Sequence, residues 1–218
     1  MHNDFTRPEN KTDLEDREAA GFWKAIALSK DIGESSREIN LAVILEINKC
    51  ILENATPESA GVLRVAGQDI KKLKCVEPPL GSAVREKMHE FEKDMQHRIS
   101  LVSLHSPNIK NKKIHRQWVD DVFNLAAWIQ HSLVAIHPFC EANGRTARLM
   151  TNVILRRFGF PPTDVKIEAE SKEKYIGALC QIDNYGDYKP LRDILLKGCL
   201  ETLRKEKERK IKMAKRPK

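Results

Sequence analysis

Residues 137–148 gather side chains that are suited to holding phosphate groups. Asn143 is a good helix N-cap, so the amides of residues 144–146 are expected to be free at a helix start. Such a start attracts anions through its unpaired N–H groups and through the helix dipole. Arg145 and Arg148 are three residues apart on the same helix, which makes their guanidinium groups near neighbours. This pattern predicts a polyphosphate site.

His137 and Glu141, which precede this helix, add acid–base and metal chemistry. A histidine pKa lies near neutrality, as a general base requires. Glu141 offers a hard oxygen ligand of the kind that holds Mg²⁺ together with substrate phosphates. Gly144 allows an anion to approach the backbone closely. A base, a metal carboxylate and a phosphate cradle in one segment indicate nucleotidyl or phosphoryl transfer.

The elements that position this segment are expected to be mainly helical, because apolar residues recur at helical spacing. The second helix is expected to start at a cap formed by Ser35 or Ser36. Residues 57–79 contain Gly and Pro near their ends and short β-branched pieces, which predicts a loop with a small hairpin. The expected helices cover about residues 13–31, 36–53, 82–97, 114–136, 144–158, 171–183 and 191–210.

Composition places the chain among globular proteins of the cytoplasm. It has 218 residues, of which 41% are hydrophobic and 32% charged, and its net charge is +7. No apolar stretch is long enough to span a bilayer, and the first ten residues lack the pattern of a signal peptide. The scattered cysteines form no Cys-x-x-Cys pair, so neither a zinc cluster nor a disulfide framework is expected. They are Cys50, Cys75, Cys140, Cys180 and Cys199.

Residues 137–148 resemble the signature of the Fic and Doc family, His-Pro-Phe-x-Asp/Glu-Gly-Asn-Gly-Arg-x-x-Arg. The one departure is Ala142, which stands in place of the first signature glycine. Residues 57–64 look like the lead-in to the family's flap, and residues 175–191 look like a common C-terminal helix pair. The resemblance implies an all-α, Fic-type helical domain with a small β-hairpin flap. The implied domains are a helical extension (1–35), a Fic domain (36–203) and a basic tail (204–218), which is expected to fray into water.

The resemblance further implies a protein adenylyltransferase, which moves AMP from ATP onto a Tyr, Thr or Ser hydroxyl of a target protein with the help of Mg²⁺. It assigns His137 as the general base, Phe139 as the anchor of the loop and Glu141 as the Mg²⁺ ligand. The residues that it assigns to the nucleotide are Asn143, Gly144 and Arg145 at the β-phosphate, Arg148 at the γ-phosphate, and Tyr175 in the adenine pocket. The flap, about Leu63–Val76, would clamp the target by strand addition. The alternatives are a Doc-like kinase, which would bind the nucleotide reversed, and a non-catalytic module.

Partners and control are harder to assign from the sequence. Ser35–Asn40 is similar to the family's inhibitory motif Ser/Thr-x-x-x-Glu-Gly/Asn, but Ile39 occupies the glutamate position. We therefore expect a plain helix cap there, and an inhibitor that is either a separate, antitoxin-like protein or absent. No membrane partner is expected. Intact His137 and Glu141 favour an enzyme over a binding module that uses the basic tail, so a nucleic-acid partner is not expected either.

Overall fold

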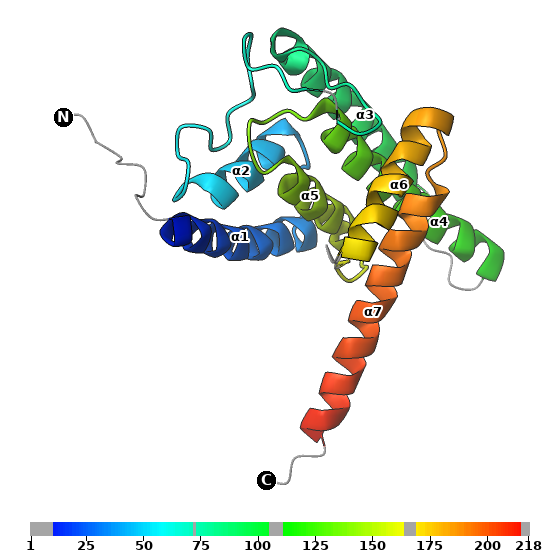
Figure 1. The fold of residues 1–218 in the computed structure, drawn as a ribbon. Coiled ribbons are helices and arrows are strands. Elements are labelled where there is room, and N and C mark those ends of the chain that lie inside the picture. The colour runs from blue at the N-terminus through cyan, green and yellow to red at the C-terminus, as the bar shows by residue number, and fades with distance from the viewer. Residues whose placement is uncertain (1–10, 72, 105–110, 164–168, 215–218) are drawn as a thin grey trace.

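The structure is a computed structural model that describes residues 11–71, 73–104, 111–163 and 169–214 (Figure 1). Over these residues the chain forms α-helices and one short 3₁₀ turn, and no strand is assigned. The expectation of an all-α domain is confirmed. The elements are α1 (Lys11–Glu34), α2 (Leu41–Leu52), η1 (Gly81–Ala83), α3 (Val84–Leu104), α4 (Lys112–Ile136), α5 (Asn143–Arg157), α6 (Ala169–Tyr185) and α7 (Lys189–Ala214).

Helix α5 lies at the centre of the domain, with α1 and α2 on one side and α4 on another (Figure 1). Its apolar residues, among them Met150 and Ile154, are fully buried. Helix α4 carries the widest set of core residues and also packs against α3 and α7. Helix α1 contributes Ala25 and Ile32 to the same core. The start of α5, which carries the predicted phosphate site, is therefore held on several sides by packed helices.

The cap of α2 differs from the expected one. The helix begins at Leu41, and the Asn40 side chain accepts a hydrogen bond from the Val43 amide at 3.3 Å. Ser35 instead ends α1, because its hydroxyl donates to the Ile32 carbonyl at 2.9 Å. Either serine was a plausible cap by type, but the local hydrogen bond of Ser35 belongs to the preceding helix.

The segment between α2 and η1 is extended loop rather than regular hairpin over its described residues. Leu63 forms one isolated antiparallel bridge with Phe139, which lies just after α4. Residue 72 lies outside the described part of the chain. The flap segment, which we define as Leu63–Val76, thus meets the motif loop at one bridge, and the hairpin itself stays a prediction.

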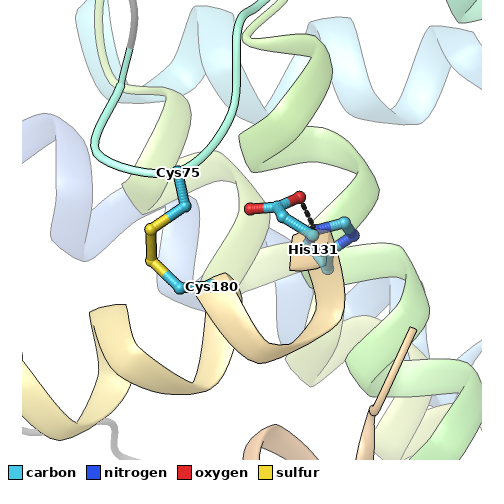
Figure 2. Close-up of a disulfide and its surroundings, with 4 residues drawn as sticks. Cys75, His131 and Cys180 are labelled. Carbon is cyan, nitrogen blue, oxygen red and sulfur yellow. Dashed lines mark hydrogen bonds and ion pairs between the residues drawn. A yellow bond between two sulfur atoms is a disulfide. The ribbon is translucent and has the colours of Figure 1, made fainter. Parts of the chain in front are cut away.

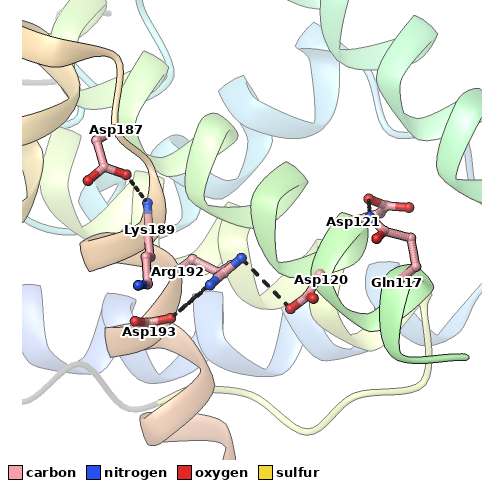
Figure 3. Close-up of polar contacts among 7 residues, drawn as sticks. All are labelled: Gln117, Asp120, Asp121, Asp187, Lys189, Arg192 and Asp193. Carbon is pink, nitrogen blue, oxygen red and sulfur yellow. Dashed lines mark hydrogen bonds and ion pairs between the residues drawn. The ribbon is translucent and has the colours of Figure 1, made fainter. Parts of the chain in front are cut away.

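Helix α7 docks through its first turns and then projects away from the rest of the domain (Figure 1). The Asp187 carboxylate accepts a hydrogen bond from the Lys189 amide at 3.0 Å, while Arg192 reaches Asp120 of α4 and Asp193 of its own helix (Figure 3). Beyond Leu203 the described side chains are exposed. The basic tail continues as helix to Ala214, and residues 215–218 lie outside the described structure. No helix in the described part of the chain has the length and apolar character needed to cross a membrane.

Candidate active site

The loop between α4 and α5 is anchored in the core by Phe139, whose side chain is fully buried. The Asn143 side chain closes the loop. Its Oδ1 accepts from the Phe139 amide at 2.9 Å, and its Nδ2 donates to the Phe139 carbonyl at 2.7 Å. Both polar ends of the Asn143 amide are thus used inside the protein. The side chain shapes the loop, while the second hydrogen of Nδ2 takes no part in these two bonds.

The N-cap of α5 is Ala142, not Asn143 as expected. Asn143 is already the first helical residue, and its side chain is committed to Phe139 rather than to the amides of the first turn. Ala142 has φ 60° and ψ 16°, a left-handed conformation that costs an L-residue other than glycine about 1 kcal/mol. The Thr146 amide donates to the Ala142 carbonyl at 2.9 Å, so it is not free either. The amides of the first turn before Thr146, those of residues 143–145, are the ones that have no helical acceptor.

His137 is the C-cap of α4 and follows directly after its last residue, Ile136. Its backbone is left-handed, with φ 50° and ψ 59°, and its amide donates to the Leu133 carbonyl at 3.1 Å. Burial lowers the pKa of the imidazole, the Arg64 charge lowers it further, and the backbone of Val134 acts in the opposite direction. A lowered pKa keeps the imidazole neutral near pH 7, which is the form that can accept a proton.

A cavity of about 470 Å³ adjoins His137 and the first turn of α5. Its walls include Gly144 and Arg148 of α5 and Tyr175 of α6. A Cβ atom added at Gly144 would lie 3.3 Å from a guanidinium nitrogen of Arg148, so glycine leaves the approach to Arg148 open. The Tyr175 hydroxyl accepts a hydrogen bond from Gln130 at 3.0 Å, and burial raises its pKa. The cavity therefore offers a neutral base, a cation and an aromatic wall together.

The two signature arginines diverge in their surroundings. Arg148 lines the cavity, and no carboxylate in the described part of the chain lies within ion-pair distance of it. Arg145 turns toward α1, where its guanidinium forms a 2.7 Å ion pair with Glu18. One arginine is thus paired with α1 while the other lines the cavity, and the joint phosphate cradle expected from their spacing stays a prediction. Sequence spacing gave no sign of Glu18.

Glu141 is exposed at the end of the motif loop. The carboxylate of Glu141 accepts a hydrogen bond from the Thr56 hydroxyl at 3.3 Å. Its backbone carbonyl accepts one from Nδ2 of the buried Asn48 side chain at 3.2 Å. Asn48 also donates to the Thr146 hydroxyl and accepts from the Gly61 amide. Sequence reasoning missed Asn48. The available signal was its position one helical turn after Ile44, where a polar residue stands on the otherwise apolar face of α2.

Cys75 and Cys180 form a disulfide, although the scattered cysteines gave no indication of a disulfide framework. Their Cα atoms are 5.3 Å apart, and the bond ties the flap segment to α6 near the hydrogen bond between His131 and Asp183 (Figure 2). The residues are separated by 105 positions in the sequence, so spacing alone could not reveal the pair. A second cavity of about 220 Å³ lies beside this disulfide and shares four lining residues with the first, Leu73, Val134, Ile176 and Leu179.

Comparison with known proteins connects this site to a family. The profile of the Fic/DOC family matches residues 38–155, which is more than half of the chain. Protein adenylyltransferase fic-1 of Caenorhabditis elegans is 31% identical over 172 residues, covering 79% of this chain and 28% of that protein. Protein adenylyltransferase Fic of Nematostella vectensis is 30% identical over 181 residues, covering 83% of this chain and 37% of that protein. The chain thus spans about a third of the length of these curated relatives.

The fold agrees with this relationship. The structure of Fic-1 (residues 134–508) from C. elegans superposes with a TM-score of 0.66 at 26% identity, covering 91% of this chain and 52% of that one. The matched sequence profile includes the α4–α5 loop. This chain is a member of the Fic/DOC family.

Proposed function

We propose that this chain is a protein adenylyltransferase that transfers AMP from ATP to a hydroxyl side chain of a target protein. The observation that carries the proposal is the placement of a histidine with lowered pKa, His137, beside the cavity that contains Gly144 and Arg148. The names of the curated relatives, protein adenylyltransferases, support the same activity.

In this proposal the neutral His137 takes the proton from the target hydroxyl as its oxygen attacks the α-phosphorus of ATP. A new P–O bond forms to the target, the bond between the α-phosphorus and its bridging oxygen breaks, and pyrophosphate leaves. Arg148 holds the terminal phosphate, since its guanidinium lines the cavity without a carboxylate partner in the described structure. The amides of the first α5 turn receive the β-phosphate.

The roles of Asn143 and Arg145 in this proposal follow from their contacts. Asn143 shapes the loop through its two bonds to Phe139, and the remaining Nδ2 hydrogen of this cavity-lining residue can reach the β-phosphate. Arg145 binds the β-phosphate with the guanidinium nitrogens that remain beside its ion pair with Glu18, or after leaving that pair. Tyr175 and the adjoining apolar residues of α6 form the wall of the adenine pocket.

Glu141 fits the role of Mg²⁺ ligand. Glu141 is exposed, and its carboxylate has no cationic partner in the described part of the chain. No cluster of three or more metal-ligating side chains occurs among the described residues. A single carboxylate suits Mg²⁺, which keeps most of its waters and takes further oxygens from substrate phosphates. The ion would neutralise phosphate charge when bound.

The target is proposed to lie along the flap segment. Val62 and Val65 flank the bridge between Leu63 and Phe139, and the two valines are each 53% exposed. An extended target segment can pair with exposed strand-like backbone beside the base. We propose that control comes from a separate inhibitory protein or is absent, since the Glu38 carboxylate is bonded to Gln96 rather than to a signature arginine.

Labelled ATP tests this proposal. The purified chain is incubated with Mg²⁺ and a lysate, using ATP labelled at the α-phosphate in one sample and at the γ-phosphate in another. Protein labelling from the α position alone supports AMP transfer. Labelling from the γ position alone would assign the chain to the Doc-like kinase alternative, and labelling from neither would favour the non-catalytic module.

A further inference from the structure

Arg64 is the largest fully buried side chain of the domain as described, with 1% of its surface exposed. Its guanidinium donates four hydrogen bonds to backbone carbonyls. Nε donates to His137 at 2.6 Å and Nη2 to Ile136 at 3.2 Å. Nη2 also donates to Pro79 at 2.7 Å, and Nη1 to Gln68 at 3.1 Å. The side chain therefore joins the end of α4 to two points of the segment that contains the flap.

No carboxylate in the described structure forms an ion pair with this buried cation. Burial lowers the pKa of Arg64, and the charge of Asp69 counteracts that effect. The Asp69 carboxylate itself accepts a hydrogen bond from the Gly81 amide at 2.7 Å. The cost of burying the guanidinium is offset chiefly by carbonyl dipoles, two of which belong to the unpaired C-terminal end of α4.

The contact falls on one of the two residues other than glycine that have a left-handed backbone in the described part of the chain. His137 adopts the left-handed conformation, which is unfavourable for a residue other than glycine and persists only where surrounding contacts determine it. The Arg64 amide adds a further hydrogen bond, to the Pro138 carbonyl at 2.9 Å. Main chain and side chain of one residue thus hold three consecutive carbonyls, those of Ile136, His137 and Pro138.

From this geometry we infer that Arg64 is a positioning residue that sets the backbone of the general base relative to the flap, and so relative to the target hydroxyl. The inference rests on the proposed function, because it assigns the base role to His137. Arg64 itself is not among the residues that line the cavity. A misplacement of about 1 Å between reacting groups can cost on the order of a hundredfold in rate.

Arg157 supplies a matched control. Its guanidinium also donates to backbone carbonyls, those of Ile32 at 3.0 Å, Gly33 at 3.3 Å and Arg37 at 2.6 Å. These contacts join α5 to the end of α1, away from the motif loop. Arg64→Met removes four carbonyl contacts of a fully buried guanidinium, and Arg157→Met removes three of a half-buried one. Only the first set includes the backbone of His137.

Steady-state transfer from α-labelled ATP is compared among wild type, Arg64→Met, Arg64→Lys and Arg157→Met. We expect Arg64→Met to lower kcat by about tenfold to a hundredfold with KM for ATP within a few-fold, and Arg157→Met to keep kcat close to wild type. Arg64→Lys should fall between, because an ammonium can satisfy only part of the carbonyl set. If Arg64→Met does not fold, the kcat of Arg64→Lys tests the inference in its place. Wild-type kcat in Arg64→Lys and Arg64→Met, or equal losses in Arg157→Met, would overturn the inference.

An NMR titration of the nucleotide-free protein separates this inference from the proposed activity. The charged and titratable groups around His137 are Arg64 from the flap side, Arg148 from α5, and Lys172 and Tyr175 from α6. Loss of the Arg64 charge in Arg64→Met should raise the His137 pKa and speed amide exchange at residues 137–139, whereas Arg157→Met should change neither. If wild type transfers no label but these shifts occur, the proposed function fails and the positioning stands. Unchanged titration and exchange in Arg64→Met would refute the positioning.

Discussion

Asn143→Ala tests whether this side chain builds the loop or binds phosphate. The substitution removes two hydrogen bonds, of 2.9 and 2.7 Å, and leaves the amide and carbonyl of the fully buried Phe139 without partners. Each lost bond with a buried orphan costs about 1–3 kcal/mol, which gives a loss of about 2–6 kcal/mol in unfolding free energy for the two bonds. For a chain of this length, that corresponds to a fall in Tm of roughly 4–24 °C.

Urea denaturation and thermal melting measure the loss, and calorimetric titration with ATP is carried out below the melting range of the variant. Asn40→Ala is the control, since it removes a single cap bond on α2 and should cost about 1 kcal/mol. We expect Asn143→Ala to be the more destabilised of the two. Stability within about 0.5 kcal/mol of wild type, combined with lost ATP affinity, would show that the Asn143 side chain contacts phosphate directly.

Three further predictions address the metal, the tail and control. Glu141→Ala should raise the Mg²⁺ concentration required for transfer sharply, as a metal titration of initial rates would show; wild-type transfer in excess chelator would contradict this role. Truncation after Leu203 should leave Tm and transfer rate unchanged, because Ile211 and Met213 are 45% and 62% exposed, and a truncated chain that fails to fold would refute it. Glu38→Gly should label itself from α-labelled ATP as wild type does, since Glu38 is bonded to Gln96, whereas a gain of tenfold or more would identify Glu38 as an internal inhibitor.

Periodicity and the motif located the helices and the α4–α5 loop from sequence, because both are local signals. Apolar spacing placed α4 and α5 within about two residues of their observed bounds, and Phe139 is buried as expected. The departure at Ala142 was visible in the sequence, and the structure shows that its backbone takes the left-handed conformation which glycine tolerates best.

The remaining features depend on segments distant in sequence. Glu18 meets Arg145 only because α1 packs on α5, and Cys75 meets Cys180 only because the flap segment reaches α6. The error over the N-cap of α5 has a different cause. Asparagine is favoured at caps by type, but the Asn143 side chain has a better pair of partners in the buried backbone of Phe139.

The most direct test of the account compares wild type with His137→Ala, using α-labelled ATP for transfer and calorimetry for ATP affinity. The account predicts that wild type labels protein from the α position, that the variant loses about a hundredfold or more in rate, and that ATP affinity stays within a few-fold. Removing a base should lower kcat without removing a phosphate contact. Full transfer by His137→Ala would contradict the central claim that this histidine is the general base of the site.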